Sequence, residues 1–191
     1  MSETSISPDI SFGRSVSRKA ERRPFSHLLV WITSYDFIII DTNCATSPLL
    51  INALTAADSV LIPITPEFYA IEGLTDLIST VLKNKRRLNP AIEFEGIVFT
   101  ISDVRTNLYK TARADVDAAF SDDIYIFDTV IPRTVQVGEA IKRGLTVIQY
   151  DKTSPASYAY QELAREVIVN ASFQGTASTP TAHNARIECT S

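Results

Sequence analysis

The sequence contains few of the residues on which many protein sites are built. Only two cysteines and two histidines occur in 191 residues, and Cys189 and His183 both lie in the polar C-terminal segment. Two cysteines cannot form a disulfide framework, so a reducing compartment is indicated. With His27 as the only other histidine, neither a Ser/His/Asp triad nor a histidine-based metal site is expected. Cys44 is interpreted as a small residue filling a tight loop, in preference to a reactive thiol.

Long apolar runs are also missing. The longest, residues 28–32 and 37–40, fall far short of the roughly 20 residues that cross a bilayer. The first 25 residues are polar and lack the apolar stretch of a signal peptide. We therefore expect a cytoplasmic protein without membrane contact.

The composition that remains is that of one globular domain, with 45% hydrophobic and 21% charged residues. Residues 1–24 and 173–191 have no apolar periodicity and are expected to be disordered tails around a domain at 25–172. That domain is acidic, with 12 Lys and Arg against 18 Asp and Glu. Binding of nucleic acid would therefore need a local basic patch.

Short β-branched runs alternate with longer amphipathic stretches between the two tails. Strands are predicted at residues 36–41, 59–64, 94–101, 124–131 and 145–149, and helices at 48–57, 70–88, 107–120, 135–143 and 155–170. Alternation of this kind, with continuously apolar strands, predicts an α/β fold with a parallel sheet and helices on both faces. Ligands of such folds bind beyond the carboxyl ends of the strands.

Two features of this pattern suggest binding of Mg²⁺ or of phosphate groups. The apolar run FIIID ends in Asp41. A Walker B strand also ends in an aspartate, whose carboxylate holds Mg²⁺ through water. A strand that simply ends in a turn aspartate has the same pattern. The partner motif G-x-x-x-x-G-K-[ST], which cradles phosphates, is missing from the sequence. A basic run, Lys83, Lys85, Arg86 and Arg87, is suited either to DNA phosphates or to the dipole of its own helix end.

Several segments together carry a resemblance to a known family. In chain order they are YDFIIIDT, LLINALTAADSVLIPITPEFYAIEGLTDL, LNPAIEFEGIVFT, DVRTNL, DTVIPR and YDKTSPASYAYQELAREVI. This series resembles the ParA/Soj partition ATPases over about residues 35–170. The resemblance implies a P-loop NTPase fold of the ParA/MinD type, with ATP and Mg²⁺ as cofactors. It also implies a centromere-binding ParB-like partner, non-specific DNA and a role in plasmid or chromosome partitioning.

The sequence departs from this family at important positions. Residues before 35 are expected to be unrelated, so the first βα portion with its K-G-G-x-G-K-T loop is predicted to be lost by truncation. The resemblance assigns Asp41 and Thr42 to the Walker B loop, with Asp41 as the Mg²⁺ residue, and Pro132 and Arg133 to the loop that lines the adenine. It assigns Arg105 to DNA contact, although capping of its own turn is an equal alternative. A second DNA-contacting arginine of the family corresponds to Gln136.

Without the phosphate loop no catalytic residue is assigned and ATP hydrolysis is not expected, because phosphoryl transfer depends on positioning and charge neutralisation. The first hypothesis is a ParA-like partition protein that does not hydrolyse ATP, and that is nucleoid-associated if DNA binding survives. The alternatives are a nucleotide-independent interaction module, for instance in a heterodimer with a full-length homologue, and a non-functional remnant of a partition gene.

Overall fold

The computed structural model describes residues 37–43, 47–67, 70–175 and 184–190, and strands and helices alternate along them. The strands are β1 (Phe37–Asn43), β2 (Ser59–Ile64), β3 (Glu93–Ser102), β4 (Ile126–Pro132) and β5 (Asn184–Thr190). The helices are α1 (Pro48–Ala56), α2 (Ala70–Arg87), α3 (Asn107–Phe120), α4 (Val135–Lys142), α5 (Val147–Tyr150) and α6 (Pro155–Gly175).

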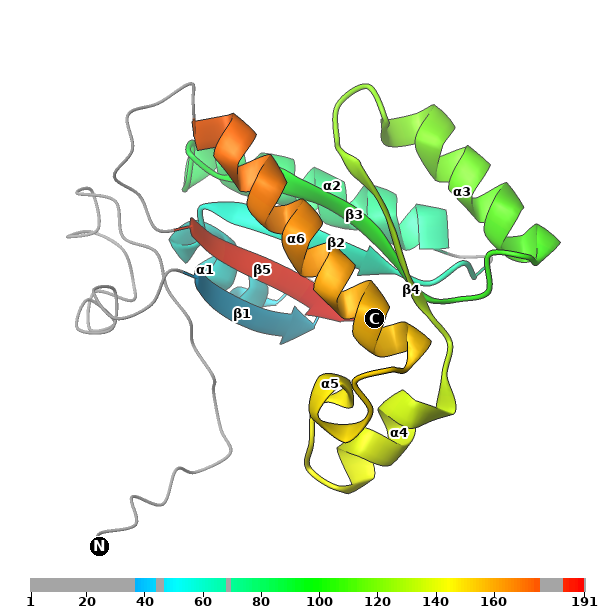
Figure 1. The fold of residues 1–191 in the computed structure, drawn as a ribbon. Coiled ribbons are helices and arrows are strands. Elements are labelled where there is room, and N and C mark those ends of the chain that lie inside the picture. The colour runs from blue at the N-terminus through cyan, green and yellow to red at the C-terminus, as the bar shows by residue number, and fades with distance from the viewer. Residues whose placement is uncertain (1–36, 44–46, 68–69, 176–183, 191) are drawn as a thin grey trace, which may run out of the picture.

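The strands form one sheet in the order β1-β5-β2-β3-β4, and every strand pair in it is parallel. Figure 1 shows β5 lying between β1 and β2, which are consecutive in the chain. Because all strands run the same way, their carboxyl ends meet at one edge of the sheet. The predicted parallel sheet is confirmed.

Helices cover both faces of this sheet (Figure 1). On one face, α1, α2 and α3 enclose the larger core, which includes Leu50, Leu54, Val81, Phe99 and Val116. On the other face, α6 closes a smaller core, whose buried members are Leu61, Val98, Phe127, Ile131 and Leu163. The prediction of helices on both faces is therefore also confirmed.

Helix starts follow from capping residues in the sequence. Ser47 precedes α1, and its Oγ accepts a hydrogen bond of 3.3 Å from the Leu50 N–H, with Pro48 at the first helical position. Thr106 caps α3 in the same way through the Tyr109 N–H at 3.2 Å. Helix α3 accordingly has the bounds that the sequence predicts.

The predicted strand at residues 145–149 is wrong, because Val147–Tyr150 form the short helix α5. The Thr146 Oγ1 accepts from the Gln149 N–H at 3.2 Å, and the Gln149 Oε1 accepts from the Thr146 N–H at 3.0 Å. This capping box satisfies two backbone N–H donors at the start of the turn and favours a helix over an extended chain. Helices α4 and α5 pack together beyond the carboxyl end of β4 (Figure 1).

The prediction of a disordered tail from residue 173 is wrong for the segments that the structure describes. Helix α6 continues to Gly175, and Asn184–Thr190 form β5. Strand β5 pairs with β1 over seven positions and with β2 over Ser59–Leu61. It therefore connects β1 to the rest of the sheet. The predicted tail at residues 1–24 lies outside the described residues.

Candidate functional site

The carboxyl edge of the sheet carries the residues that the sequence singles out. Asp41 and Thr42 lie near the end of β1, and Pro132 and Arg133 lie at the end of β4. Arg105 follows β3, in the loop before α3. This is the edge at which parallel α/β domains bind their ligands.

Asp41 and Thr42 occupy one side of this edge, because β1 is the outermost strand. Asp41 is exposed and Thr42 is half-buried. Their register partners on the neighbouring strand β5 are Glu188 and Cys189. Cys44, which the sequence places in the same loop, lies outside the described residues.

Pro132 ends the outer strand β4 on the opposite side of the sheet, and Arg133 directly follows it. The Arg133 N–H donates to the carbonyl of Ser102 on β3 at 3.2 Å, while its side chain is exposed. Three strands separate β1 from β4, which at the usual strand spacing amounts to about 19 Å. The structure thus does not bring Asp41 together with Arg133.

The loops at this edge are poorly suited to phosphate. The segments that follow β1, β2, β3 and β4 are residues 44–47, 65–69, 103–106 and 133–134, and none contains a glycine or a lysine. Glycine permits backbone N–H groups to approach a phosphate, and lysine neutralises its charge. The loops at this edge therefore lack the glycine and lysine pattern of a phosphate loop. Asp41 as a Mg²⁺ residue stays a prediction, and the described residues contain no group of three potential metal ligands.

Arg105 is held by Asp103, two residues earlier in the same loop. Its Nε donates to Asp103 Oδ1 at 3.0 Å and its Nη2 donates to Oδ2 at 2.9 Å. The Arg105 backbone N–H also donates to Oδ1 at 3.1 Å, and the guanidinium remains largely exposed. Hydrogen bonding by Arg105 lowers the pKa of Asp103 to about 2. These contacts support the turn-stabilising alternative, while the role of Arg105 in DNA contact stays a prediction.

The basic run at the end of α2 lies at the other end of the sheet. Lys85 Nζ pairs with the Glu93 carboxylate at 2.8 Å, and Glu93 is the first residue of β3. Arg105 follows the last residue of β3, so the length of that strand, roughly 30 Å, separates the two basic sites. A polar cavity of about 420 Å³ opens beside the run, lined by Ile51, Asp76, Ser79, Thr80, Lys83, Asn84, Arg87 and Leu88. Arg105 and the basic run therefore do not form one patch.

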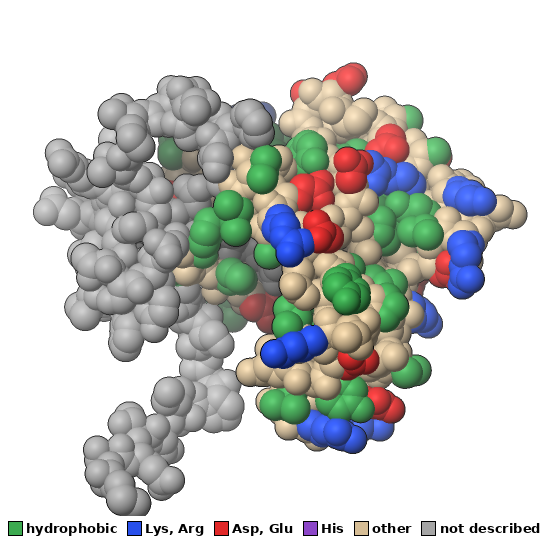
Figure 2. Space-filling view, viewed as in Figure 1, with side chains coloured by type: hydrophobic (Ala, Val, Ile, Leu, Met, Phe, Trp, Pro, Cys, Tyr) green, Lys and Arg blue, Asp and Glu red, His purple; other side chains and the backbone are tan. Residues whose placement is uncertain are grey.

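The charged side chains are mixed over the face that α6 covers. Figure 2 shows Lys and Arg interspersed with Asp and Glu there, with apolar side chains between them. No helix among the described residues is both long and apolar enough to span a membrane.

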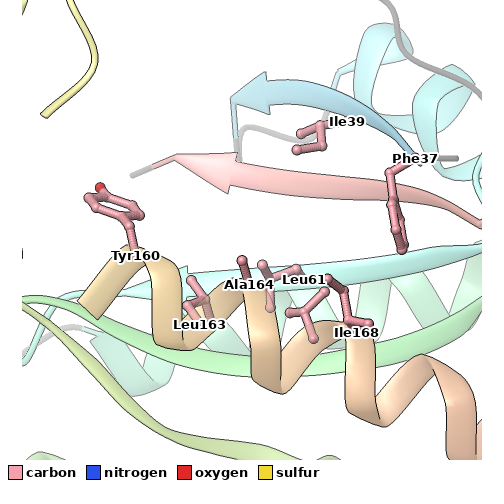
Figure 3. Close-up of a pocket in the computed structure, with 8 residues that line it drawn as sticks. Phe37, Ile39, Leu61, Tyr160, Leu163, Ala164 and Ile168 are labelled. Atoms are coloured by element: carbon pink, nitrogen blue, oxygen red, sulfur yellow. The ribbon is translucent and has the colours of Figure 1, made fainter. Parts of the chain in front are cut away.

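An apolar groove was not anticipated from the sequence. It lies between α6 and the strands β1 and β2, and its volume is about 330 Å³ (Figure 3). The lining residues are Phe37, Ile39, Leu61, Tyr160, Leu163, Ala164, Val167 and Ile168. The only sequence signal was the apolar content of β1, which says nothing of how far α6 covers that strand.

The fold and the edge residues define an open parallel α/β domain with an aspartate near the end of its first described strand. A family model described as an AAA domain matches residues 14–94. The chromosome partitioning protein ParA of Caulobacter vibrioides is 39% identical over 160 residues, which cover 84% of this chain and 59% of that protein. The sporulation initiation inhibitor protein Soj of Bacillus subtilis is 44% identical over 137 residues, which cover 72% of this chain and 53% of that protein.

Over the part that it spans, the chain is similar to the ParA and Soj partition proteins, as its sequence segments indicate. It spans between half and two thirds of the length of these relatives. The family match begins at residue 14, so the expectation that the residues before 35 are unrelated is wrong.

Two solved structures resemble part of this chain. Cobyrinic acid a,c-diamide synthase from Mycobacterium smegmatis, with bound ADP and magnesium, is 24% identical and has a TM-score of 0.49 over 71% of this chain and 46% of that chain. The cell division ATPase MinD of Pyrococcus furiosus is 20% identical, with a TM-score of 0.48 over 62% of this chain and 46% of that chain.

Proposed function

We propose that this chain is a ParA-like partition protein that does not itself hydrolyse ATP. The observation that carries the second half of the proposal is the composition of the four loops at the carboxyl edge, which contain neither glycine nor lysine. Hydrolysis requires that the phosphates be cradled and their charge neutralised, and these loops offer neither the glycines nor the lysine that perform these tasks in a phosphate loop.

The partners follow from the family. We propose that the chain acts in chromosome or plasmid partitioning with a ParB-like partner and non-specific DNA, in the cytoplasm or on the nucleoid. A full-length homologue that retains the phosphate loop is a third partner, with which this chain would form a heterodimer. The matches to ParA and Soj support this role, because they cover most of the chain.

Asp41, Thr42, Pro132 and Arg133 are proposed to mark the inherited nucleotide site. Asp41 and Thr42 correspond to the Walker B loop, and Pro132 and Arg133 to the adenine loop. Their separation by three intervening strands supports loss of tight nucleotide binding, because no described loop bridges the phosphate position between them.

The test is an ATPase assay of the purified chain, with and without DNA. Phosphate release should equal that of a buffer control, and Asp41→Ala should change nothing. Turnover that Asp41→Ala abolishes would overturn the proposal. Equilibrium titration with a fluorescent ATP analogue and Mg²⁺ separates binding from hydrolysis, and the expected result is no saturable binding.

A second candidate is an interaction module that needs no nucleotide, and the separation of Asp41 from Arg133 favours it. Titration of a labelled full-length homologue with this chain, in the presence and absence of ATP, distinguishes the two. Equal affinity in both conditions would favour the module. If neither the homologue, the ParB-like partner nor DNA binds, the chain is a remnant without partition function.

A further inference from the structure

The polar cavity beside the basic run lies away from the carboxyl edge of the sheet and is separate from the predicted nucleotide site. Its volume of about 420 Å³ falls within the range of pockets that hold small molecules. Six of its lining residues belong to α2, Leu88 directly follows that helix, and Ile51 belongs to α1. All of them lie in the part of the chain that the structure describes.

Two cations line this cavity without a counterion. Lys83 and Arg87 are exposed and stand four residues apart on α2, so their Cβ atoms lie about 6 Å apart on one face of the helix. Neither side chain forms an ion pair with a described residue, whereas the neighbouring Lys85 pairs with Glu93. Like charges at this spacing repel each other. An anion held between the two side chains would relieve this repulsion.

Hydrogen-bond acceptors line the remainder of the cavity. Asp76 contributes an exposed carboxylate, and the Thr80 Oγ1 donates its proton to the Asp76 carbonyl at 3.0 Å, which leaves its lone pairs for a donor. Asn84 is 2% exposed, and its Nδ2 donates to the Ile51 carbonyl at 3.4 Å and to the Thr55 Oγ1 at 3.1 Å. The Asn84 Oδ1 accepts no hydrogen bond from the described residues. Because a buried acceptor without a donor is unfavourable, the cavity favours a ligand that donates hydrogen bonds.

The cavity therefore suits a ligand with an anionic end and a donor-rich end. Two cations match a phosphate monoester, which carries a charge of roughly −1.5 to −2 at neutral pH, better than they match a singly charged carboxylate or phosphodiester. The acceptors match hydroxyl groups. We propose that the cavity binds a small phosphate monoester of the sugar-phosphate class, with its phosphate at Lys83 and Arg87 and its hydroxyl groups at the acceptors. The proposal does not depend on the partition function.

The spacing along α2 agrees with this orientation. Asp76 and Lys83 are seven residues apart, about 10 Å along the helix axis, and this separation leaves room for a ligand between the two charges. Side chains of an α-helix lean toward its N-terminus, which directs Lys83 and Arg87 toward the acceptors. The phosphate and the hydroxyl groups of one molecule can thus reach both sets of side chains.

Isothermal titration calorimetry of the full chain tests the proposal, with ribose 5-phosphate as the probe. We expect saturable binding of ribose 5-phosphate, weaker binding of inorganic phosphate and no binding of ribose. Lys83→Gln and Arg87→Gln should each weaken ribose 5-phosphate by at least about tenfold, since a hydrogen bond to a charged group contributes that much to affinity. Asp76→Ala should weaken ribose 5-phosphate but not inorganic phosphate, because it removes an acceptor of hydroxyl groups.

Arg86 provides the matched control. It is exposed, carries the same charge and directly precedes Arg87 on α2, but it does not line the cavity. Arg86→Gln should leave the affinity for ribose 5-phosphate unchanged. Circular dichroism and thermal melting check that every variant folds.

Four outcomes would overturn the proposal. The first is no saturable binding of ribose 5-phosphate at millimolar concentration. The second is an equal loss of affinity in Arg86→Gln and Arg87→Gln, which would show an effect of net charge alone. The third is equal affinity for inorganic phosphate and ribose 5-phosphate. The fourth is displacement of ribose 5-phosphate by non-specific duplex DNA at equal phosphate concentration, which would assign the cavity to nucleic-acid phosphates.

Discussion

The guanidinium of Arg105 forms a bidentate ion pair with the carboxylate of Asp103, with Nε–Oδ1 and Nη2–Oδ2 distances of 3.0 Å and 2.9 Å. The cation that the family resemblance assigns to DNA is therefore already engaged by an anion of its own loop. A phosphate would have to compete with Asp103. The exposure of the pair, with the Arg105 side chain at 86% and the Asp103 side chain at 42%, makes this competition possible, because solvent-screened pairs contribute little.

We predict that Asp103→Asn strengthens binding of non-specific duplex DNA, because it releases Arg105 and removes a negative charge beside it. The salt dependence of the affinity should steepen by about one unit of slope, as expected for one additional phosphate contact. Gln136→Arg should strengthen binding for the same reason, and Arg105→Glu should abolish it. The measurement is a fluorescence anisotropy titration at low salt.

Arg86→Glu is the control for the DNA experiment, because Arg86 lies in the last turn of α2, at the opposite end of the sheet from Arg105. It should leave DNA binding nearly unchanged. A loss as large as that of Arg105→Glu would assign binding to the basic run instead. No binding by the original chain would favour the interaction module.

Glu166 is predicted to join α6 to β4 in a pH-dependent way. Its carboxylate accepts from the Tyr125 hydroxyl at 2.7 Å, the Asp128 N–H at 2.9 Å and the Thr129 N–H at 3.2 Å. Partial burial by itself would raise the pKa of Glu166. The hydrogen bonds from Thr129, Tyr125 and the Asp128 backbone have the opposite and larger effect, so the net result is a lowered pKa. Glu166→Gln should lower the free energy of unfolding at neutral pH by about 2 kcal/mol.

The sign of the pH dependence follows from the lowered pKa. The contribution of Glu166 is complete above the ordinary glutamate pKa and is lost as the pH falls through the lower pKa of the folded state. Urea unfolding of the original chain and Glu166→Gln should therefore converge in acid. Glu162→Gln, on the same helix, removes only a surface pair with Arg165 and should cost less than about 1 kcal/mol. Equal losses in the two variants would contradict the prediction.

Gly96 is predicted to be irreplaceable in β3. Its φ is +147°, and a Cβ there would lie 2.6 Å from Phe127 Cε2 and 2.7 Å from the Tyr125 carbonyl oxygen. Gly96→Ala should lower the free energy of unfolding by about 3 kcal/mol, from strain and overpacking. Gly138→Ala is the control, because α4 leaves that position open, and it should be neutral or stabilise by about 0.5 kcal/mol. Chemical unfolding of both variants checks the contrast.

Strand β5 is predicted to stabilise the sheet from its interior. Ile187 is in register with Ile40 on β1 and with Val60 on β2. Ile187→Pro removes a backbone donor within the ladder and should lower the free energy of unfolding by more than about 1 kcal/mol. The measurement is urea unfolding, and an unchanged free energy of unfolding in Ile187→Pro would contradict the prediction.

The elements of the main domain could be predicted from the sequence because their causes are local. β-branched runs set β2 at the residues that the pattern indicates, and the Thr106 cap fixes the start of α3. The similarity to ParA and Soj was also within reach of the sequence, because it depends on the identity and order of segments. The short helix α5 was missed because its apolar residues fit a strand equally well, and only the capping box decides between the two.

Only the tertiary structure decided which of these residues meet. Strand β5 lies more than 140 positions after β1 in the chain, yet it pairs with it, and no local propensity of a polar C-terminal segment encodes that choice. The same strand order places Asp41 and Arg133 on opposite outer strands and leaves Phe37 and Ile39 facing a groove. These relationships depend on sheet order and on how far one helix covers a face, and both are set by packing between segments distant in sequence.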